Sequence, residues 1–201
     1  MRKELPTTHE PEDSGWSAFA AYTAGTSVVR DGHRANLAGM PMVESTVVVP
    51  VTPEIAFAVS QTTGAERMRW DTFIREQHYL DGAERAAKGV RTLTVSRRGA
   101  RMTSEYVSFS PPSNVGMKIV DGPWFFERLG GGWRFTAVEG GTLAVWRYNF
   151  RCRPALIRWP AERIGVWLTQ RDIDRRIAGF ARGCLDPAVL ASARRIADEW
   201  D

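Results

Sequence analysis

Short runs of alternating apolar and polar residues, separated by turn-forming residues, dominate the chain from about residue 43 to residue 153. β-Branched and aromatic residues fill these runs, and Gly, Pro, Asn and Asp fill the gaps, which is typical of strands joined by tight turns. Such short connections leave no room for crossover helices, so consecutive strands are expected to pair antiparallel. The predicted strands are residues 43–50, 70–79, 89–97, 101–109, 115–121, 124–129, 132–138 and 142–153, with Gly130–Gly132 interpreted as a hairpin turn.

Two short helices are predicted between the first two strands. Thr52 is suited to the N-cap, Pro53 to the first helical position, and Glu54 to the positive end of the helix dipole. Gly64 ends this helix, and residues 65–69 are long enough for a second one.

The period of the pattern changes to that of an amphipathic helix in the last third of the chain. This helix is expected over residues 155–184, with its apolar face at Val166, Ile173, Ile177, Phe180 and Cys184. Its polar face is assigned to Asp172, Asp174, Arg175, Arg176 and Arg182. Asp186 is a good N-cap for a final helix over residues 186–201.

The chain is expected to divide into three parts. Residues 1–40 are polar and rich in helix-breaking residues, so they bury too little apolar surface to fold on their own and are predicted to be a mobile extension. Residues 43–184 form the predicted domain, and residues 186–201 form the extra C-terminal helix.

Composition excludes several classes of protein. A hydrophobic content of 43% and a charged content of 25% are ordinary for a globular domain. No apolar stretch is long enough for a transmembrane helix or a signal peptide, so we expect a cytoplasmic protein without stable membrane insertion. The net charge is +4 without any block of basic residues, so no nucleic-acid partner is expected.

Sites for metals, nucleotides and activated nucleophiles are not expected either. Two cysteines, Cys152 and Cys184, and three scattered histidines lack the spacing of a zinc site, and the cysteines are interpreted as small buried residues. The chain has no Walker A loop, no dinucleotide fingerprint and no Gly-x-Ser-x-Gly elbow. We therefore predict no metal and no cofactor.

Three stretches resemble the START-like (SRPBCC) superfamily, in its polyketide cyclase/dehydrase and lipid-transport branch. They are VESTVVVPVTPEIAFAV, VSFSPPSNV and FFERLGGGWRFTAVEGGTLAVWRYNF, and the resemblance covers roughly residues 43–184. It implies an α+β helix-grip fold, in which an antiparallel sheet of about seven strands wraps around a long C-terminal helix, with two short helices after the first strand. It also implies an apolar cavity between sheet and helix.

Strand alternation indicates which side chains face such a cavity. Trp146, Tyr148 and Phe150 share one face of their strand, as Trp133 and Phe135 share one face of theirs. The predicted ligand-binding residues are Tyr106, Met117, Trp133, Phe135, Trp146, Tyr148 and Phe150.

Two functions remain open at this point. The first is binding of a hydrophobic small molecule, such as a lipid, isoprenoid or polyketide, by a monomer or a homodimer. The second is an aromatase/cyclase or dehydratase that needs neither metal nor nucleotide, with Tyr106, Tyr148 or His78 as the acid or base. Further polar candidates are Asp71, Ser108 and Glu105, the last expected on the outer face beside arginines such as Arg147.

Overall fold

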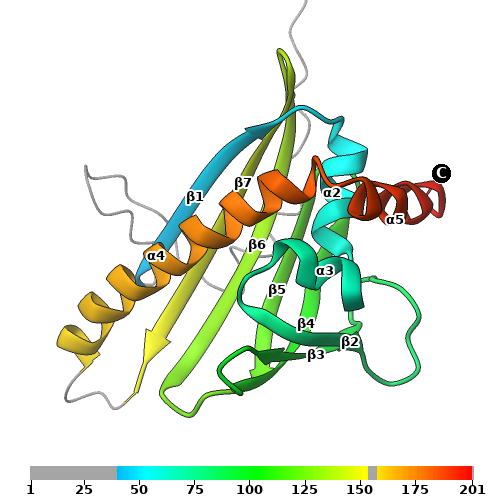
Figure 1. Cartoon of the computed structure of the whole chain (residues 1–201). Helices are drawn as coiled ribbons and strands as arrows, with labels where there is room; N and C mark the ends of the chain where they lie inside the picture. The colour runs from blue at the N-terminus through cyan, green and yellow to red at the C-terminus, as the bar shows by residue number, and fades with distance from the viewer. Residues whose placement is uncertain (1–39, 154–157, 201) are drawn as a thin grey trace, which may run out of the picture.

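A seven-stranded sheet and four helices make up the part of the chain that the structure describes, residues 40–153 and 158–200 of a computed structural model (Figure 1). The strands are β1 (Met42–Val49), β2 (Ile74–Tyr79), β3 (Arg91–Ser96), β4 (Arg101–Ser110), β5 (Asn114–Asp121), β6 (Phe126–Val138) and β7 (Gly141–Cys152). The helices are α2 (Pro53–Gln61), α3 (Gly64–Trp70), α4 (Arg158–Gly183) and α5 (Pro187–Asp198). The predicted N-terminal extension lies outside the described residues, except for Met40.

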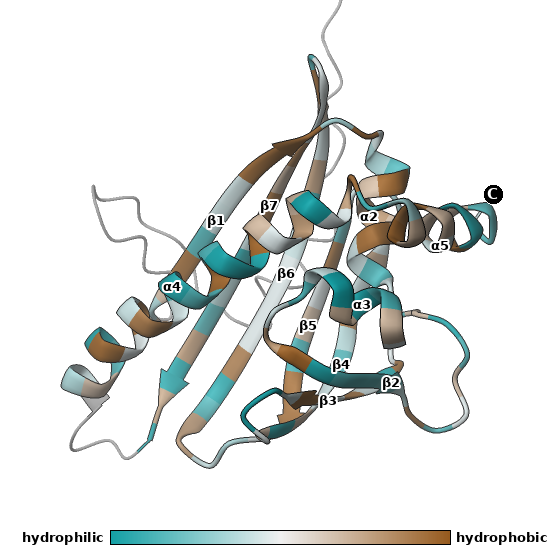
Figure 2. Ribbon diagram, in the orientation of Figure 1, coloured by the Kyte–Doolittle hydropathy of each residue, from teal (hydrophilic) through white to brown (hydrophobic). Residues whose placement is uncertain are grey.

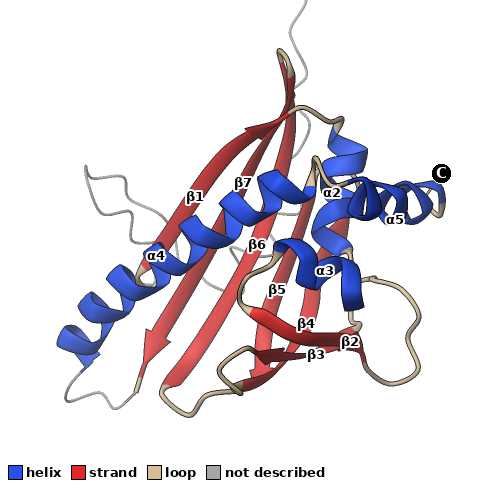
Figure 3. Ribbon diagram, in the orientation of Figure 1, coloured by secondary structure: helices blue, strands red, loops and turns tan. Residues whose placement is uncertain are grey.

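Every neighbouring pair of strands is antiparallel, in the order β1-β7-β6-β5-β4-β3-β2. Hairpins connect β2 to β7 in sequence, whereas β1 joins the far edge by pairing with β7, where Val43 lies opposite Tyr148. The helix α4 crosses one face of this sheet, as Figure 3 shows. The predicted α+β helix-grip fold, with two short helices after the first strand, is therefore confirmed.

Two predicted element boundaries are wrong. Residues 130–132 are not a turn, because β6 runs through them without a break. A Cβ atom on Gly131 would overlap the ring of Tyr148, and one on Gly132 would overlap the carbonyl oxygen of Val115, so these glycines permit close approach of neighbouring strands. Residues 70–79 are not one strand either, because α3 extends to Trp70 and β2 begins only at Ile74.

The predicted starts of α2 and α5 are correct, but they differ in how they are capped. Thr52 occupies the N-cap of α2 without a side-chain capping bond, and Pro53 fills the first helical position. At α5, the Oδ1 atom of Asp186 accepts hydrogen bonds from the backbone N–H groups of Ala188 and Val189. The second carboxylate oxygen of Asp186 accepts two bonds from Arg69, which ties α5 to α3.

Part of the core lies where α2 packs between the sheet and α5. Phe57 of α2 is fully buried, and its ring makes edge-on contacts with Phe109, Phe135 and Trp200 at centroid distances of 5.4, 5.7 and 5.0 Å. In Figure 2 hydrophobic residues gather where α2 meets the start of α5. Because α5 also buries Val189, the C-terminal helix is part of the same core as the rest of the domain.

The two cysteines are free thiols inside this core. Burial raises the pKa of the Cys184 thiol to about 12, so it stays protonated at neutral pH. The interpretation of both cysteines as small buried residues is confirmed.

We predict that Phe57→Ala lowers the free energy of unfolding by about 3–5 kcal/mol, because it opens a cavity among three aromatic rings. The control is Ile164→Ala on the exposed face of α4, which should change stability by less than about 0.5 kcal/mol. Urea unfolding followed by far-ultraviolet circular dichroism measures both. A loss below about 1 kcal/mol for Phe57→Ala contradicts its central place in the core.

Candidate functional site

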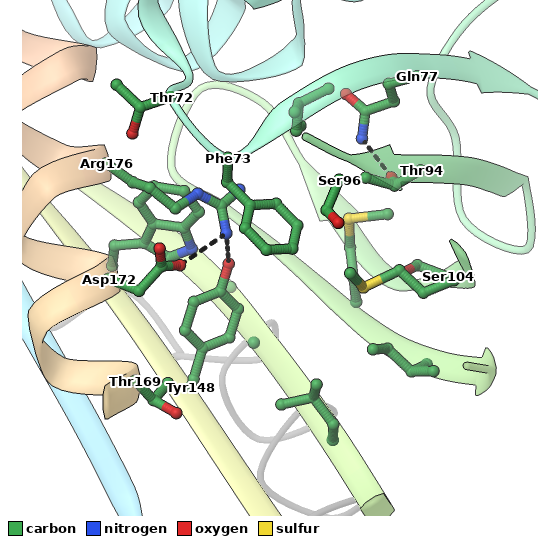
Figure 4. Close-up of a pocket in the computed structure, with 18 of the residues that line it drawn as sticks. Thr72, Phe73, Gln77, Thr94, Ser96, Ser104, Tyr148, Thr169, Asp172 and Arg176 are labelled. Carbon is green, nitrogen blue, oxygen red and sulfur yellow. Dashed lines mark hydrogen bonds and ion pairs between the residues drawn. The ribbon is translucent and has the colours of Figure 1, made fainter. Parts of the chain in front are cut away.

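A cavity of about 1090 Å³ lies between the sheet and α4 (Figure 4). Apolar side chains from β4, β5, β6 and β7 form much of its wall: Met102, Val115, Met117, Ile119, Leu129, Trp133 and Trp146. Polar side chains from β2, β3 and β4 form another part of the wall: Gln77, Thr94, Ser96 and Ser104. The cavity therefore has an apolar region and a polar region.

Five of the seven residues predicted to bind ligand line this cavity. They are Tyr106, Met117, Trp133, Trp146 and Tyr148. The indole rings of Trp133 and Trp146 stack at a centroid distance of 4.0 Å and present a flat apolar surface.

Phe135 and Phe150 share the inward face with these residues but are not among the described residues of the cavity wall. The ring of Phe135 contacts Phe57, and that of Phe150 contacts Phe126 at 6.0 Å. Strand alternation identifies the inward face, but it does not show where along the strand a helix already fills the space.

The three catalytic candidates have different surroundings. His78 has a half-exposed side chain beside Glu76 on the edge strand β2 and is not among the described cavity residues. The hydroxyl of Tyr106 donates to Oε1 of Gln61 at 3.0 Å, and burial raises its pKa well above the usual value. The hydroxyl of Tyr148 accepts a hydrogen bond of 2.8 Å from Arg176, and its own proton remains available to a molecule in the cavity.

Arg176 belongs to a buried charge cluster with Asp71 and Arg67. It donates from Nε and Nη2 to the two oxygens of Asp71, at 3.0 and 2.8 Å. Arg67 donates from Nε to the same carboxylate at 3.0 Å and from Nη1 to the carbonyl of Ser60 at 2.6 Å. These bonds connect α2, α3 and α4 at the cavity wall.

The pKa shifts in this cluster follow from burial and from two cations sharing one anion. Burial alone would raise the pKa of Asp71, but the guanidinium groups of Arg176 and Arg67 outweigh it and hold that pKa below its usual value. Burial alone would lower the pKa of Arg176, but Asp71, Tyr148 and Asp172 together outweigh it and raise that pKa. The pKa of Arg67 is lowered by burial and by the like charge of Arg176, against the attraction of Asp71.

Aromatic faces complete the surroundings of the two guanidinium groups. The Arg176 Cζ atom lies 4.4 Å from the ring centroid of Trp146 and 4.9 Å from that of Phe73. The Arg67 Cζ atom lies 4.1 Å from the ring centroid of Trp70. Because a planar guanidinium stacks favourably on aromatic rings, these contacts offset part of the cost of burying the charge.

Sequence reasoning named Asp71 but missed both arginines. Arg176 was expected on the polar face of α4, yet it is only 7% exposed. Its position three residues after Ile173 and four before Phe180 places it on the buried stripe, and this spacing was the available signal. Arg67 carried a similar signal, since it stands four residues before Asp71 at the end of a helix.

The remaining polar candidates do not line the cavity among the described residues. Glu105 pairs with Lys118, which lies directly opposite on β5, at 3.0 Å. The expected pairing of Glu105 with Arg147 is wrong, because Arg147 pairs with Glu44, its direct neighbour on β1. Ser108 is buried, and its hydroxyl has no hydrogen-bond partner among the described residues.

Neither a metal cluster nor a membrane span is found in the described residues. No three side chains of His, Cys, Asp or Glu in residues 40–153 and 158–200 gather to hold a metal ion. None of the four described helices has the length and apolar character needed to cross a bilayer.

We predict that Asp71→Asn lowers the free energy of unfolding at pH 7 by about 3–5 kcal/mol, because it leaves two buried guanidinium groups without their counter-charge. The folded-state pKa of Asp71 is below its unfolded value of about 3.9. The stabilisation is therefore present above that value and is lost as the pH falls through the folded pKa.

Urea unfolding at pH 7 and pH 3 measures this dependence. The wild-type protein should lose more stability between the two pH values than the Asp71→Asn variant does. Asp121→Asn, at an exposed carboxylate on β5, is the control and should behave like the wild type. Equal acid sensitivity of wild type and Asp71→Asn contradicts the assignment.

Solved structures of similar fold come from bacteria and a plant. A protein of Thermus thermophilus is 15% identical with a TM-score of 0.60, over 72% of this chain and 97% of that one. A START superfamily protein of Mycobacterium smegmatis is 12% identical with a TM-score of 0.56, and the match covers 70% of this chain and 97% of that one. Major latex-like protein 151 of Panax ginseng is 14% identical with a TM-score of 0.50, and the match covers 67% of this chain and 95% of that one. At these identities the likeness shows the fold alone.

Comparison of the sequence with known families shows the family of this chain. No curated protein matches the chain. Residues 40–184, however, match the sequence profile of the family described as polyketide cyclase/dehydrase and lipid transport. Because this match covers most of the chain, the protein belongs to the polyketide cyclase/dehydrase and lipid-transport family of the START-like (SRPBCC) superfamily.

Proposed function

We propose that this protein binds a hydrophobic small molecule in the cavity between the sheet and α4. The observation that carries the proposal is a cavity of about 1090 Å³ with an apolar region that β4, β5, β6 and β7 form. Small-molecule sites are typically concave spaces of roughly 300–1,000 Å³, mostly apolar with a few convergent polar groups. The family and its description, which includes lipid transport, agree with such a role.

The ligand's apolar part lies against β5, β6 and β7. The stacked rings of Trp133 and Trp146 suit a flat or extended hydrocarbon, and Met117 adapts to its outline. Each methylene group removed from water contributes about 0.8 kcal/mol, so even a medium-length chain gains enough to hold it in place.

The test uses the neutral fluorescent probe N-phenyl-1-naphthylamine, whose emission rises on transfer to an apolar site. We predict saturable binding to the wild-type protein and about tenfold weaker binding to Met117→Gln. The variant presents an unpaired amide to the bound probe, at a cost of about 1–3 kcal/mol. Met68→Gln, on the exposed surface of α3, is the matched control and should bind like the wild type. Failure of the wild type to bind the probe contradicts the proposal.

A second candidate function is that of a cyclase or dehydratase, and the hydroxyl of Tyr148 favours it. This hydroxyl lies in the cavity wall and accepts a hydrogen bond from Arg176. That bond stabilises the phenolate which forms when Tyr148 gives its proton to a leaving hydroxyl group. Of the three catalytic candidates, Tyr148 is the one whose geometry supports this role.

The experiment follows dehydration of a 3-hydroxyacyl thioester to the enoyl thioester and water, by the ultraviolet absorbance of the product. If the protein is a dehydratase, Tyr148→Phe should lower the rate by about a hundredfold, the typical contribution of a general acid. Tyr79→Phe is the control, because Tyr79 is not among the described residues that line the main cavity. An unchanged rate in Tyr148→Phe removes Tyr148 from the mechanism.

A further inference from the structure

Basic side chains far outnumber acidic ones around the cavity. Among the described residues that line it, eight are cationic: Arg67, Arg97, Arg98, Lys118, Arg171, Arg175, Arg176 and Arg182. Asp172 is the one acidic residue in the same described wall. The whole chain carries a net charge of only +4, so this imbalance is a local property of the cavity.

Acidic neighbours neutralise only part of this charge. Asp71 is shared by Arg67 and Arg176, which leaves this buried cluster one positive charge in excess. Asp172 approaches Arg176 only to 4.0 Å, longer than a hydrogen bond, and its side chain is 41% exposed. Within the described part of the chain, Arg98 and Arg175 have no carboxylate at ion-pair distance.

The guanidinium of Arg176 can donate hydrogen bonds into the cavity. This guanidinium is nine-tenths buried, and its position is fixed by Asp71 and Tyr148. These bonds use three of the five N–H groups that an arginine carries, and the residue still lines the cavity. A rigid, partly unused guanidinium of this kind matches the oxygens of a carboxylate or phosphate group.

Four of these positive side chains extend from two segments that border the same space. Arg97 and Arg98 extend from the turn between β3 and β4, next to the polar wall, and Arg175 and Arg176 extend from α4. Figure 4 shows Arg176 and Asp172 on the α4 side of the cavity, and Ser96 on the β3 side. Apolar side chains of Phe125, Leu129 and Leu168 line other parts of the same cavity.

We propose that the ligand is an amphipathic anion, with an apolar body and a carboxylate or phosphate head group held by Arg98, Arg175 and Arg176. This inference rests on the proposed function, because it names the chemical class of molecule that the hydrophobic cavity takes. An apolar chain by itself would leave Arg98 and Arg175 without an anionic partner at ion-pair distance among the described residues. An anionic oxygen group supplies that partner while the chain stays against the aromatic wall.

The test compares molecules with one chain and different head groups. Dodecanoate, dodecyl phosphate and dodecanol each compete with bound N-phenyl-1-naphthylamine in dilute buffer at pH 7.5. We expect at least one anion to compete at least fivefold more strongly than dodecanol, and added salt to reduce the difference. The comparison of dodecanoate with dodecyl phosphate distinguishes the two kinds of head group.

Two double variants test whether the preference for anions over dodecanol arises from side chains of the cavity wall. Arg98→Gln with Arg175→Gln should reduce the preference for the anion while binding of the neutral probe is kept, since both side chains are exposed. Arg194→Gln with Arg195→Gln removes the same charge from the exposed surface of α5 and should keep the preference.

The outcomes separate this inference from the proposed function. If the probe binds but dodecanol competes as well as both anions, the anionic ligand is excluded and a hydrophobic ligand remains. If the Arg98/Arg175 variant keeps the preference, the assignment of the head-group site is wrong. If the probe does not bind the wild type, the proposed function fails, and the ligand class fails with it.

Discussion

The rest of the site depends on the ion pairs that the buried carboxylate of Asp71 forms with two guanidinium groups. Asp71 directly follows α3, is bound by Arg67 of α3 and Arg176 of α4, and through Arg176 is connected to Tyr148 of β7. Hydrophobic contacts alone permit a helix to slide or rotate against a sheet, whereas paired charges with directed hydrogen bonds fix one arrangement. The cluster thus sets the position of α4 at the point where the cavity begins.

The inward face of the sheet has different surroundings in its two parts. Near α2 and α5 it is covered by aromatic rings that pack edge-on around Phe57. Farther along, the rings of Trp133 and Trp146 stack on each other and border the cavity. On the β6 side, the missing side chain of Gly131 lets the ring of Tyr148 lie close to the strand. Alternation along β6 and β7 therefore gives the inward face, whereas the packing of the helices decides which part of it borders the cavity.

Much of the fold follows from local signals in the sequence, whereas the site follows from them only in part. Period-two runs, short turns and the proline and aspartate at helix starts each act over a few residues, so they predict strands, hairpins and helices correctly. Gly130–Gly132 were misinterpreted because glycine marks both a turn and a close approach of strands, and only the neighbouring strand distinguishes them. Arg176 was missed because a buried charge needs a partner from another element, here Asp71, more than 100 positions away in the chain.

The same network that stabilises the fold also prepares the cavity for its ligand. Since Arg176 is held by Asp71 before any ligand arrives, its guanidinium loses little conformational freedom on binding, and less of the binding energy is spent on ordering it. Aromatic faces and the hydroxyl of Tyr148 surround the guanidinium of Arg176 and offset part of the cost of the excess positive charge in this cluster. Apolar surface then supplies most of the affinity, and the fixed cations decide which of many hydrophobic molecules is kept.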